Sequence, residues 1–557
     1  VYLFEELAKD CHQLEKDFIE SLIQQNYCNV LDNELIKEIL RDIHFDDNDI
    51  DLSSIESKYD LKRDTILRII LYFGISCLQL YTFDNFLSFI ENDTHFDNCL
   101  QFVKELDLKY DYSLTSDGQQ CYPMARNVAL LKLSRLAFNK IKPHLTDDNV
   151  VHVLWRMRSA IIHQISVINA SNSLFQEILL DSKTIEEFIL NNETIGLSLK
   201  IDLLNELLNA FLWFGDIERI KANLESAQQM SGLTIGLSGA LGLRTQYQQT
   251  AVPQLMVKIN RTSNDLNGCS QALEVNSDLP KNVALNDDTL LNSIKFVSLE
   301  DNANNETMDL TETEQILMLS YIKCYQRIGS PSDELLSEQL DSYLAFLISK
   351  TRIWSVLTNC LLMRSLLEKD KRRRVERSMS QINELVDCVR ESHLNSVQTI
   401  QRSQHFYSVL PNPFWITERY LANVLVSLGV NKSALDIYLR LNLWDDVIDC
   451  YQRIGRRDKA EAIIRDQLKD KETPLLYCLL GDTTDDLEYY EKALQLSDRK
   501  FPRAHKALGN YYFNLKQYSE SIPHFQQSVA FNSMQIDVWF RLAFAAMSTE
   551  DYDIILI

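Results

Sequence analysis

Four glycines lie close together near the middle of the chain and raise the question of phosphate binding. The segment SGLTIGLSGALGLRTQYQQ carries Gly232, Gly236, Gly239 and Gly242 within eleven residues. A phosphate loop requires a Gly-Lys-Ser/Thr ending and a buried strand before it, which aims the backbone amides at the anion. The segment has neither feature. We therefore expect a close-packed turn against helical layers, with Arg244 either capping a helix or binding a partner.

A basic cluster is the second candidate for chemistry in this acidic chain. Its members are Lys369, Lys371, Arg372, Arg373, Arg374 and Arg377. On one continuous helix, Lys369, Arg373 and Arg377 would share a face. Three interpretations stay open: a solvated face that pairs with Asp and Glu of the same chain, a docking surface for a partner, and a nuclear-import patch. Intramolecular pairing is the favoured interpretation.

Nucleophiles and metal ligands are dispersed along the chain. The ten histidines and eleven cysteines form no CxxC pair and no HExxH motif, and no GxSxG or paired-carboxylate motif stands out. A single histidine on a helix, such as His505 or His524, is more often packed or exposed than catalytic. We therefore predict a protein that is not an enzyme, with no catalytic residues, no cofactor and no metal. The dispersed thiols indicate a reducing compartment.

The elements that carry these residues are predicted to be helices. Glycine and proline contribute 14 and 10 of the 557 residues, about a third of their usual combined share. Sheets and turn-rich folds use more of both residues, so the composition predicts an all-α fold. The net charge of −23 repels phosphate groups. We therefore expect no direct binding of nucleic acid and none of membranes.

Targeting signals are not evident in the sequence. The first residues carry charges throughout, unlike a signal peptide. The longest apolar stretch, IILYFGISCL between Arg68 and Gln79, has about half the length that spans a bilayer, so we predict a buried helix. We expect a soluble, cytoplasmic protein, with the nucleus as a further location. The start on Val1 and the stop at Ile557 within a repeat indicate a fragment of a longer protein.

Four regions are predicted along the chain. Residues 1–225 form an N-terminal helical region, and 226–312 a Gly-rich segment followed by an acidic polar linker, expected to be the non-helical section. Residues 313–413 form a helical region with an Arg-rich helix, and 414–557 the repeats. The first helix is indicated by an apolar stripe at Leu3, Leu7, Leu14, Phe18 and Leu22.

A repeat of 34 residues relates the stretch beginning at Pro502 to the one beginning at Ile536. At this offset the following pairs match: Leu508 with Leu542, Gly509 with Ala543, and Tyr518 with Tyr552. This period and residue order are those of the tetratricopeptide repeat, a pair of antiparallel helices. The small residue lets the two helices approach closely, and aromatics at Tyr512, Phe525 and Trp539 are expected between neighbouring hairpins.

Degenerate copies of the repeat precede the two clear ones. Trp444, Tyr451, Gly455 and Ala460 fit one copy, and Leu480-Gly481 with Tyr490 fits a shortened one; residues 421–438 fit a further copy. Because a single hairpin cannot bury its apolar face, such units occur in stacks. We predict a C-terminal α-solenoid of about five hairpins.

Three stretches within the repeats carry a narrower resemblance. They are LNLWDDVIDCYQRIGRRDKAEAII (441–464), KETPLLYCLLGD (471–482) and MQIDVWFRLAFAAMSTEDY (534–552), supported by the segments 231–248, 287–294 and 366–381. With these motifs the chain resembles the tetratricopeptide repeat protein 27 family, which includes the fungal protein essential for maintenance of the cell wall. The resemblance covers about residues 231–552. The first 225 residues agree with the family only in being helical.

The resemblance implies a non-enzymatic scaffold that binds other proteins. It implies a chaperone-linked folding or assembly cofactor, with Hsp90-type machinery and large GTPases such as elongation factor 2 and its spliceosomal relative as partners. The alternative is a scaffold subunit of an RNA-processing or trafficking complex, with cell-wall maintenance as a downstream role in fungi.

Tetratricopeptide domains that grip the carboxylate tail of Hsp90 or Hsp70 use a Lys and an Asn four residues apart on one first helix. Lys506 and Asn510 match this spacing, although Arg541 stands where the next repeat should supply Asn. The residues predicted to bind a partner are therefore Arg244, Arg373, Arg374, Arg377, Lys506, Asn510 and Arg541.

Overall fold

The computed structural model describes residues 19–22, 24–43, 52–88, 94–109, 114–145, 149–167, 169–193, 195–261, 279–297, 310–330, 333–390, 396–470, 472–484 and 486–551. Several predictions from the sequence fall outside them. These are the apolar stripe from Leu3 to Phe18, the stretches 262–278 and 298–309 of the predicted linker, and the repeat match at Tyr552.

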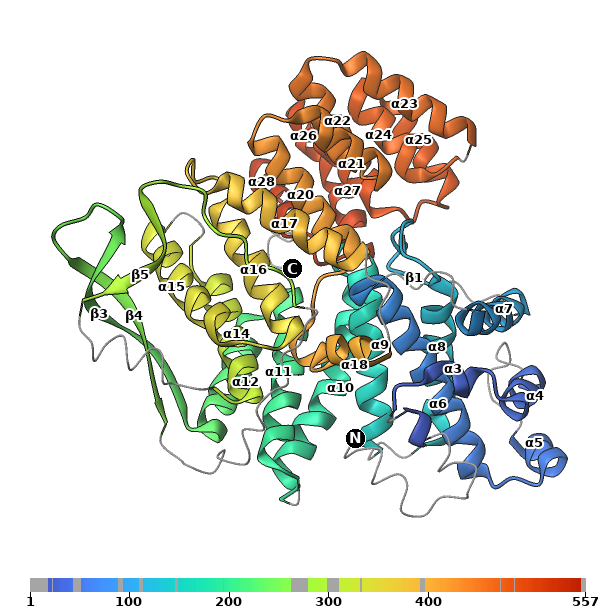
Figure 1. The fold of residues 1–557 in the computed structure, drawn as a ribbon. Helices are drawn as coiled ribbons and strands as arrows, with labels where there is room; N and C mark the ends of the chain where they lie inside the picture. Colours follow the sequence, from blue (N-terminus) through green and yellow to red (C-terminus); the bar gives the residue numbers. More distant parts are fainter. Residues whose placement is uncertain are drawn as a thin grey trace. The chain divides into compact units, whose positions relative to one another are not determined.

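Helices dominate the described chain (Figure 1), which confirms the predicted fold class. The chain divides into two compact units. The first comprises Val1–Tyr112, Arg126–Ser159 and Ile178–Leu428. The second comprises Gly429–Ile557 together with two short segments from the N-terminal half, Ser113–Ala125 and Ala160–Glu177.

The first unit is a helical body. Its N-terminal part contains α3 (Tyr27–Leu31), α4 (Glu34–Asp42), α5 (Leu52–Tyr59), α6 (Arg63–Thr82), the π-helical turn η2 (Phe83–Leu87), α7 (Thr94–Lys109), α8 (Val128–Ile141) and the 3₁₀ turn η3 (Lys142–His144). Then follow α11 (Leu197–Phe214), α12 (Ile217–Ser231), α14 (Glu312–Ile328), α15 (Glu334–Lys350), α16 (Trp354–Glu368), α17 (Val375–Arg390), α18 (Ser396–Ser403), α19 (Phe406–Val409) and α20 (Phe414–Ser427). Two further helices, α9 (Val150–Ser166) and α10 (Asn172–Asn191), contribute residues to both units.

The apolar stretch before Gln79 forms the central part of α6 and is buried, as predicted. Together with η2, this helix (Arg63–Leu87) is long and apolar enough to cross a membrane by length and composition, but 89% of its most apolar window is buried inside the fold. The burial is that of a core helix. Its Gly74 lies so close to α8 that an added Cβ would stand 2.8 Å from the Phe138 ring.

Local side-chain hydrogen bonds set the ends of several helices. At the start of α14, the Thr311 hydroxyl accepts a bond from the Glu314 N–H, and the Glu314 carboxylate accepts one from the Thr311 N–H. This reciprocal capping satisfies two of the amides that a helix start leaves free. Before it, α11 ends at Gly215 in the left-handed region, and Asp216 then caps α12.

A three-stranded antiparallel sheet replaces the turn that we predicted for the glycine-rich segment. Its order is β4 (Val252–Arg261), β3 (Leu233–Thr245), β5 (Leu290–Phe296). The register places Leu233 opposite Arg261 and Gly242 opposite Val252. The prediction of a close-packed turn is therefore wrong. The apolar residues between the glycines alternate with small ones, and that alternation is a strand pattern.

The two faces of the β3–β4 hairpin are buried at opposite ends. Leu233, Ile235 and Ile259 are buried at the end next to α12, on the face of the odd-numbered residues. Further along, Ala240 and Gln254 are buried on the opposite face. The odd-numbered face is therefore exposed toward the tip of the hairpin, since successive side chains of a strand point to opposite sides.

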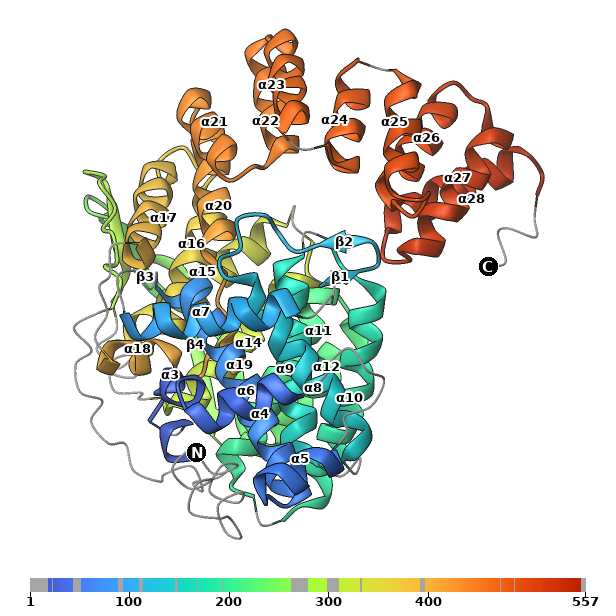
Figure 2. The same cartoon turned by 90° about the vertical axis from the view of Figure 1, so that its right-hand side faces the viewer.

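The second unit contains the predicted hairpins. Its helices are α21 (Asn431–Arg440), α22 (Trp444–Ile454), α23 (Arg457–Asp470), α24 (Pro474–Thr484), α25 (Leu487–Leu496), α26 (Pro502–Asn514), α27 (Tyr518–Phe531) and α28 (Ile536–Ser548). Figure 2 shows them following one another in an arch. The starts of α26 and α28 are separated by the 34 residues that the sequence predicts.

Close helix approach within the hairpins depends on glycine, as expected. A Cβ added at Gly509 on α26 would lie 2.6 Å from the Phe525 ring on α27. In the shortened copy, a Cβ at Gly481 would lie 2.6 Å from the Tyr490 ring. Both rings occupy the space that the missing side chain leaves free.

The aromatic residues of the repeats divide between two positions. Phe525 is fully buried in a cluster with Val538 and Leu542 of the following helix, as predicted for a residue between hairpins, and Trp539 packs against this cluster. Tyr512 instead stacks on His524 of its own hairpin, with ring centroids 5.7 Å apart.

The two short N-terminal segments of this unit pack along the turns between repeats. They contain a small hairpin of β1 (Thr115–Ser116) and β2 (Gln119–Gln120). The Tyr122 hydroxyl donates to the Leu441 carbonyl before α22, and the Asn532 side chain after α27 donates to the Ala170 carbonyl at 3.2 Å. The array is thus built from more than the C-terminal stretch.

Candidate functional site

The residues predicted to bind a partner fall into two groups, one in each unit. Lys506, Asn510 and Arg541 lie on the first helices of neighbouring hairpins in the array. The other residues, Arg244, Arg373, Arg374 and Arg377, lie in the helical body around β3 and the turn from α16 to α17.

In the array, Lys506 is paired with a carboxylate of the next hairpin. Its Nζ lies 2.6 Å from Asp537 Oδ2 at the start of α28. Burial by itself raises the pKa of Asp537, but the hydrogen bond and charge of Lys506 outweigh it, so that the pKa is lowered. Both side chains remain partly exposed. An incoming carboxylate would therefore compete with Asp537 for the ammonium group.

Asn510 and Arg541 form a second contact between the same two helices. Arg541 Nη1 donates to Asn510 Oδ1 at 3.0 Å, and the guanidinium lies 5.7 Å from the centre of the Phe513 ring. The Asn510 side chain keeps its amide N–H groups as donors, and Arg541 keeps most of its own. The structure thus brings together all three array residues that the sequence singled out.

Arg503 belongs to the same surface, and sequence reasoning missed it. It lies three residues before Lys506 on α26 and makes a two-pronged contact with Asp445 on α22, at 2.9 Å for Nη1. It also lies 3.3 Å from Asp482 on α24. Burial by itself lowers the pKa of Arg503, but the two carboxylates raise it. The i, i+3 spacing to Lys506 is the signal that could have identified this residue.

The two histidines of the array pack against neighbouring aromatic rings. His505 stacks on Phe531 with ring centroids 6.0 Å apart, and His524 lies 5.9 Å from it. Burial lowers the pKa of both histidines. His505 Nε2 bonds to the Arg499 carbonyl, which fixes the ring in the repeat.

The basic cluster of the body lies at a helical hairpin and not along one helix. Lys369 caps the end of α16, Arg373 and Arg374 lie in the turn, and Arg377 belongs to α17. The prediction that Lys369, Arg373 and Arg377 share one helix face is therefore wrong. The helix periodicity continues through the stretch in sequence, but a turn at 370–374 reverses the chain.

Three of the cluster's arginines pair with carboxylates of the same unit. Arg374 Nη1 lies 2.8 Å from Asp341 on α15, and Arg377 forms a two-pronged, buried pair with Glu368. Arg373 bonds to the Thr289 hydroxyl at 2.8 Å and lies 3.9 Å from Asp287, with a side chain 65% exposed. Intramolecular pairing, the favoured interpretation, describes these contacts. A docking or import role for them stays a prediction.

Arg244 joins the same region from the sheet. Its guanidinium pairs with Glu338 on α15, and Lys371 lies 4.0 Å from the same carboxylate. Arg244 neither caps a helix nor lies in a turn. Its backbone N–H donates to the Gln248 side chain at the end of β3.

The segment 287–294 completes this region. Asp287 accepts hydrogen bonds from the Thr289 hydroxyl and from the backbone N–H groups of Thr289 and Leu290, and these bonds lower its pKa to about 2. Asp287 is therefore ionised beside Arg373. The segments 231–248, 287–294 and 366–381, which are remote in sequence, thus meet around α15 and the α16–α17 turn.

Comparison with known proteins agrees with the resemblance drawn from the sequence motifs. The chain is similar to the Tetratricopeptide repeat-containing protein trd-1 of Caenorhabditis elegans, 31% identical over 61% of this chain and 44% of the relative. It is also similar to the Tetratricopeptide repeat protein 27 homolog of Dictyostelium discoideum, 28% identical over 86% of this chain and 58% of the relative. The protein of Saccharomyces cerevisiae called Essential for maintenance of the cell wall protein 1 is 24% identical over 57% of this chain and 41% of its own length.

These relatives confirm the resemblance to the tetratricopeptide repeat protein 27 family. The chain spans about half the length of the curated relatives it matches. No protein-family model matches it. Among solved structures, a complex of Cut9 and Hcn1 from the APC/C covers 99% of the chain at 11% identity, with a TM-score of 0.23. A TM-score this low supports no conclusion about the fold or the function.

Proposed function

We propose that this chain is a non-enzymatic scaffold that binds other proteins through its helical array. The observation that carries the proposal is the surface shared by α22, α24, α26 and α28. On it, Arg503 and Lys506 present cations one turn apart on α26, and Arg541 presents one on α28, the first helix of the next hairpin. Each cation is partnered by a polar side chain of a neighbouring hairpin, so the surface is set in place before any partner arrives. The relatives named for the same repeat support this proposal.

The finer proposal is a chaperone-linked cofactor for folding or assembly in the cytoplasm, acting on large client proteins such as elongation-factor-2-like GTPases. The spacing of Lys506 and Asn510 supports a chaperone tail as the ligand, because an ammonium and an amide four residues apart can hold a carboxylate from one side. In the free protein Asp537 takes the place of that carboxylate on Lys506.

A binding measurement with two opposed variants tests the array surface. The probe is a labelled peptide with the sequence of the Hsp90 carboxyl-terminal tail, and the readout is fluorescence anisotropy with the full chain. We expect Lys506→Ala to weaken binding about tenfold, as the loss of one charge-assisted contact would. Asp537→Asn should strengthen binding, because it frees Lys506. Unchanged affinity in both variants would remove the array surface from the proposal.

Affinity capture from a cell extract tests the client. The full chain is compared with the Lys506→Ala variant, and the bound proteins are identified by mass spectrometry. Chaperones and large GTPases should be enriched on the wild-type chain and reduced on the variant. Recovery of one stoichiometric RNA-processing or trafficking particle would favour the alternative scaffold. Enrichment of neither class contradicts the finer proposal.

A further inference from the structure

Strand β3 is paired along most of its length by β4 on one side and along only a short part by β5 on the other. β4 pairs with it from Leu233 to Gly242. On the other side, β5 pairs with it only from Gly242 to Thr245, and Val297 adds a hydrogen bond to the Leu241 carbonyl at 2.9 Å. Within the described part of the chain, the β3 edge before Leu241 therefore faces no strand.

The direction of the free backbone groups follows from that last hydrogen bond. The Leu241 carbonyl points toward β5, and residues two apart in a strand direct their N–H and C=O groups to the same side. Ile235, Leu237 and Gly239 therefore present a row of backbone donors and acceptors along this edge. Such a row is a template for pairing with another extended chain.

Among the described residues, nothing packs closely enough on two glycines of this stretch to require the missing side chain. A Cβ added at Gly239 would meet nothing within 4 Å, and one at Gly236 would meet only the Lys258 carbonyl at 4.0 Å. Gly242 differs, because a Cβ there would lie 2.8 Å from Ile294. Glycine within a strand weakens it unless a bend or the close approach of another backbone requires it. Here the free edge is the place where another backbone could approach.

The charge of the sheet defines the partner. From Leu233 to Arg261 and from Leu290 to Phe296 the chain has four basic residues and no acidic one, in a protein with a net charge of −23. They are Arg244, Lys258, Arg261 and Lys295. Arg244 and Arg261 pair with Glu338 and Glu314. Lys258 and Lys295 are exposed and form no ion pair with another described residue. An acidic partner segment complements them.

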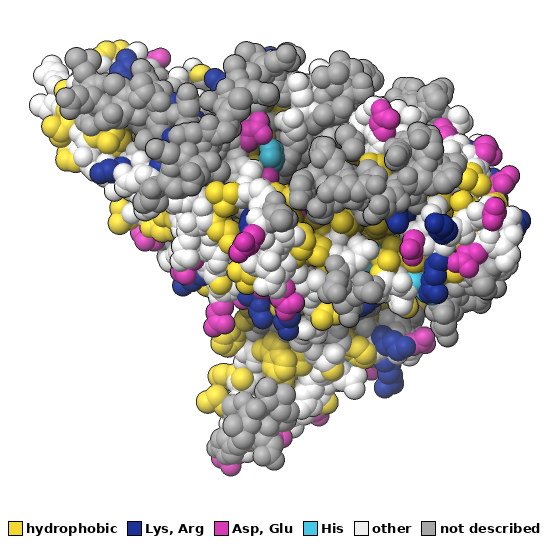
Figure 3. All heavy atoms as spheres, turned by 90° about the horizontal axis from the view of Figure 1, so that it is seen from below, with side chains coloured by type: hydrophobic (Ala, Val, Ile, Leu, Met, Phe, Trp, Pro, Cys, Tyr) yellow, Lys and Arg dark blue, Asp and Glu magenta, His cyan; other side chains and the backbone are white. Residues whose placement is uncertain are grey.

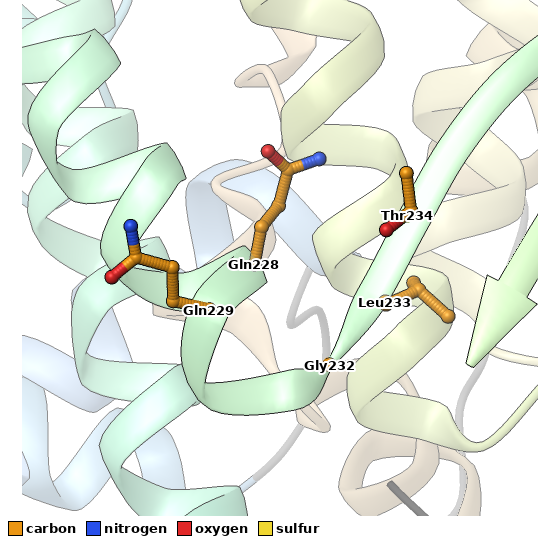
Figure 4. A pocket seen from close by; sticks show the side chains of 5 residues that line it. All are labelled: Gln228, Gln229, Gly232, Leu233 and Thr234. Atoms are coloured by element: carbon orange, nitrogen blue, oxygen red, sulfur yellow. The ribbon is translucent and has the colours of Figure 1, made fainter. Parts of the chain in front are cut away.

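Polar and apolar groups flank the two ends of this edge. At its start, a surface pocket is lined by Gln228, Gln229, Gly232, Leu233 and Thr234. Figure 4 shows that Gln228 extends beside the strand, whereas Gln229 points away from it. An amide side chain can donate to and accept from a peptide backbone.

At the far end of the edge, Leu241 and Val297 are 54% and 59% exposed on the odd-numbered face. Figure 3 shows hydrophobic side chains at the left of the surface seen from below. Apolar side chains of an added strand would pack on these residues, since residues at matching positions of adjacent strands lie on one face.

We propose that the β3 edge from Ile235 to Gly239 binds an extended segment of another protein by strand addition, and that this segment alternates acidic with apolar residues. Backbone hydrogen bonds supply the affinity. Lys258, on the even-numbered face, selects the acidic side chains, and the exposed Leu241, on the odd-numbered face, selects the apolar ones. This surface lies in the helical body. It goes beyond the proposed function, which rests on the array.

A pair of variants at one residue tests the proposal. Gly239→Pro removes an edge N–H that the chain's own ladder does not use, and Gly239→Ala keeps it. The probe is a labelled peptide, Asp-Val-Asp-Val-Asp-Val-Asp, capped at both ends and measured by anisotropy with the full chain. We expect equal binding to wild type and Gly239→Ala. Gly239→Pro should bind the peptide at least about tenfold more weakly, because a backbone hydrogen bond is lost and the proline ring blocks the edge.

The control peptide has proline in place of the central valine. It should bind the wild-type chain as weakly as the valine peptide binds the Gly239→Pro variant. Equal binding of both peptides, or of both variants, would overturn the proposal. Amide exchange of Ile235, Leu237 and Gly239 in the wild-type chain gives a measurement that does not depend on how the variants fold. Fast exchange in the free chain and slow exchange with the peptide support the proposal.

Slow exchange in the free chain would mean that the edge is already covered. If the exchange rate does not depend on protein concentration, the chain itself covers the edge. If it does, a second copy of the chain covers it. Either outcome overturns the proposal. Binding of the Hsp90-tail peptide to the array is expected to be the same in both Gly239 variants. Failure of the edge proposal is therefore separable from failure of the proposed function.

Discussion

The basic side chains of the helical body differ in how deeply they are buried. Arg377 and Glu368 are both almost fully buried and joined by two hydrogen bonds. Arg373, four residues earlier, is mostly exposed. Because a buried charge without a partner is costly and an exposed pair contributes little, the two arginines should have different roles. Arg377 holds α16 to α17, and Arg373 is accessible to a partner.

Replacing these arginines one at a time should separate the two roles. Arg377→Met removes the two-pronged partner of buried Glu368 and leaves Arg374 3.7 Å away, and we expect a loss of about 3 kcal/mol in the free energy of unfolding. Arg373→Ala should change it by less than about 0.5 kcal/mol. Urea unfolding followed by circular dichroism measures both. The double variant Arg377→Met, Glu368→Leu should recover most of the loss. Equal effects of the two single variants would contradict the assignment.

A partly buried histidine links three elements of the body. His405 Nε2 lies 3.1 Å from Glu312 at the start of α14, and Nδ1 lies 3.8 Å from Asp202 on α11. Burial by itself lowers the pKa of His405, but the hydrogen bond to Glu312 and the charges of Asp202, Glu312 and Glu206 outweigh it, so that the pKa is raised. The His405 ring therefore binds its proton more strongly in the folded protein than in the unfolded chain.

Stability should fall as the pH rises through the raised pKa of His405. The ring's contribution is fully present below the ordinary histidine pKa of about 6.5 and disappears once the folded protein also releases the proton. Asp202, whose pKa burial raises to about 6, acts at lower pH. We expect the thermal midpoint to decrease from about pH 6.5 upward. In His405→Gln this decrease should be absent. A parallel decrease in the variant would assign the effect to another group.

At the scale of elements, the hairpins of the array are held by contacts between a glycine and an aromatic ring. Gly509 and Phe525 lie on α26 and α27, and Phe525 also packs on α28 through Val538 and Leu542. One ring thus joins a hairpin internally and to the next hairpin. This double role explains how a stack of short helices, none of which buries its apolar face alone, becomes stable.

Adding one methyl group should show how tightly this hairpin is packed. Ala within a helix is usually more stable than Gly by about 0.5–1 kcal/mol. At position 509 the new Cβ would lie 2.6 Å from the Phe525 ring, and overpacking of this kind costs about 1–3 kcal/mol. We therefore expect Gly509→Ala to lower the thermal midpoint. Gly239→Ala, where nothing lies within 4 Å, is the control. A higher midpoint for Gly509→Ala would mean that the helices are not in close contact.

At the scale of the whole molecule, the repeat unit is not confined to the C-terminal stretch. Tyr122 bonds to the turn at Leu441 before α22, and Ala170 bonds to the turn at Asn532 after α27. A Cβ at Gly118 would lie 3.1 Å from the Lys500 carbonyl in the turn before α26. The turns between repeats are thus fixed from outside the repeats.

The array should consequently be less well ordered when produced by itself. In a fragment of residues 429–557, we expect faster amide exchange at the turns around Leu441, Lys500 and Asn532 than in the full chain. The α26–α27 pair around Phe525 serves as the internal control, because its packing is local. Equal exchange at the turns in both proteins would show that residues 113–125 and 160–177 do not support the array.

The sequence by itself determined the features that depend on local spacing. The 34-residue offset of α26 and α28, the close approach at Gly509 and the burial of α6 were all predicted correctly, because a helix brings residues three and four apart onto one face and repeats that pattern along the chain. The resemblance drawn from the motifs was confirmed for the same reason. The residues of a repeat make their contacts within one or two hairpins, so the motif is visible as a local pattern in the sequence.

Only the tertiary structure decided the features that depend on pairing between distant segments. The alternation of apolar and small residues between the glycines fits a strand, but the pairing of β3 with β4 and β5 joins segments that are apart in sequence, and spacing within β3 does not reveal those partners. The turn at 370–374 separates Arg373 from Arg377 because α17 packs back against α16. Arg503 finds Asp445 and Asp482 only because successive first helices are stacked. Partners that are remote in sequence are chosen by burial and charge in three dimensions, and spacing along the chain carries no record of that choice.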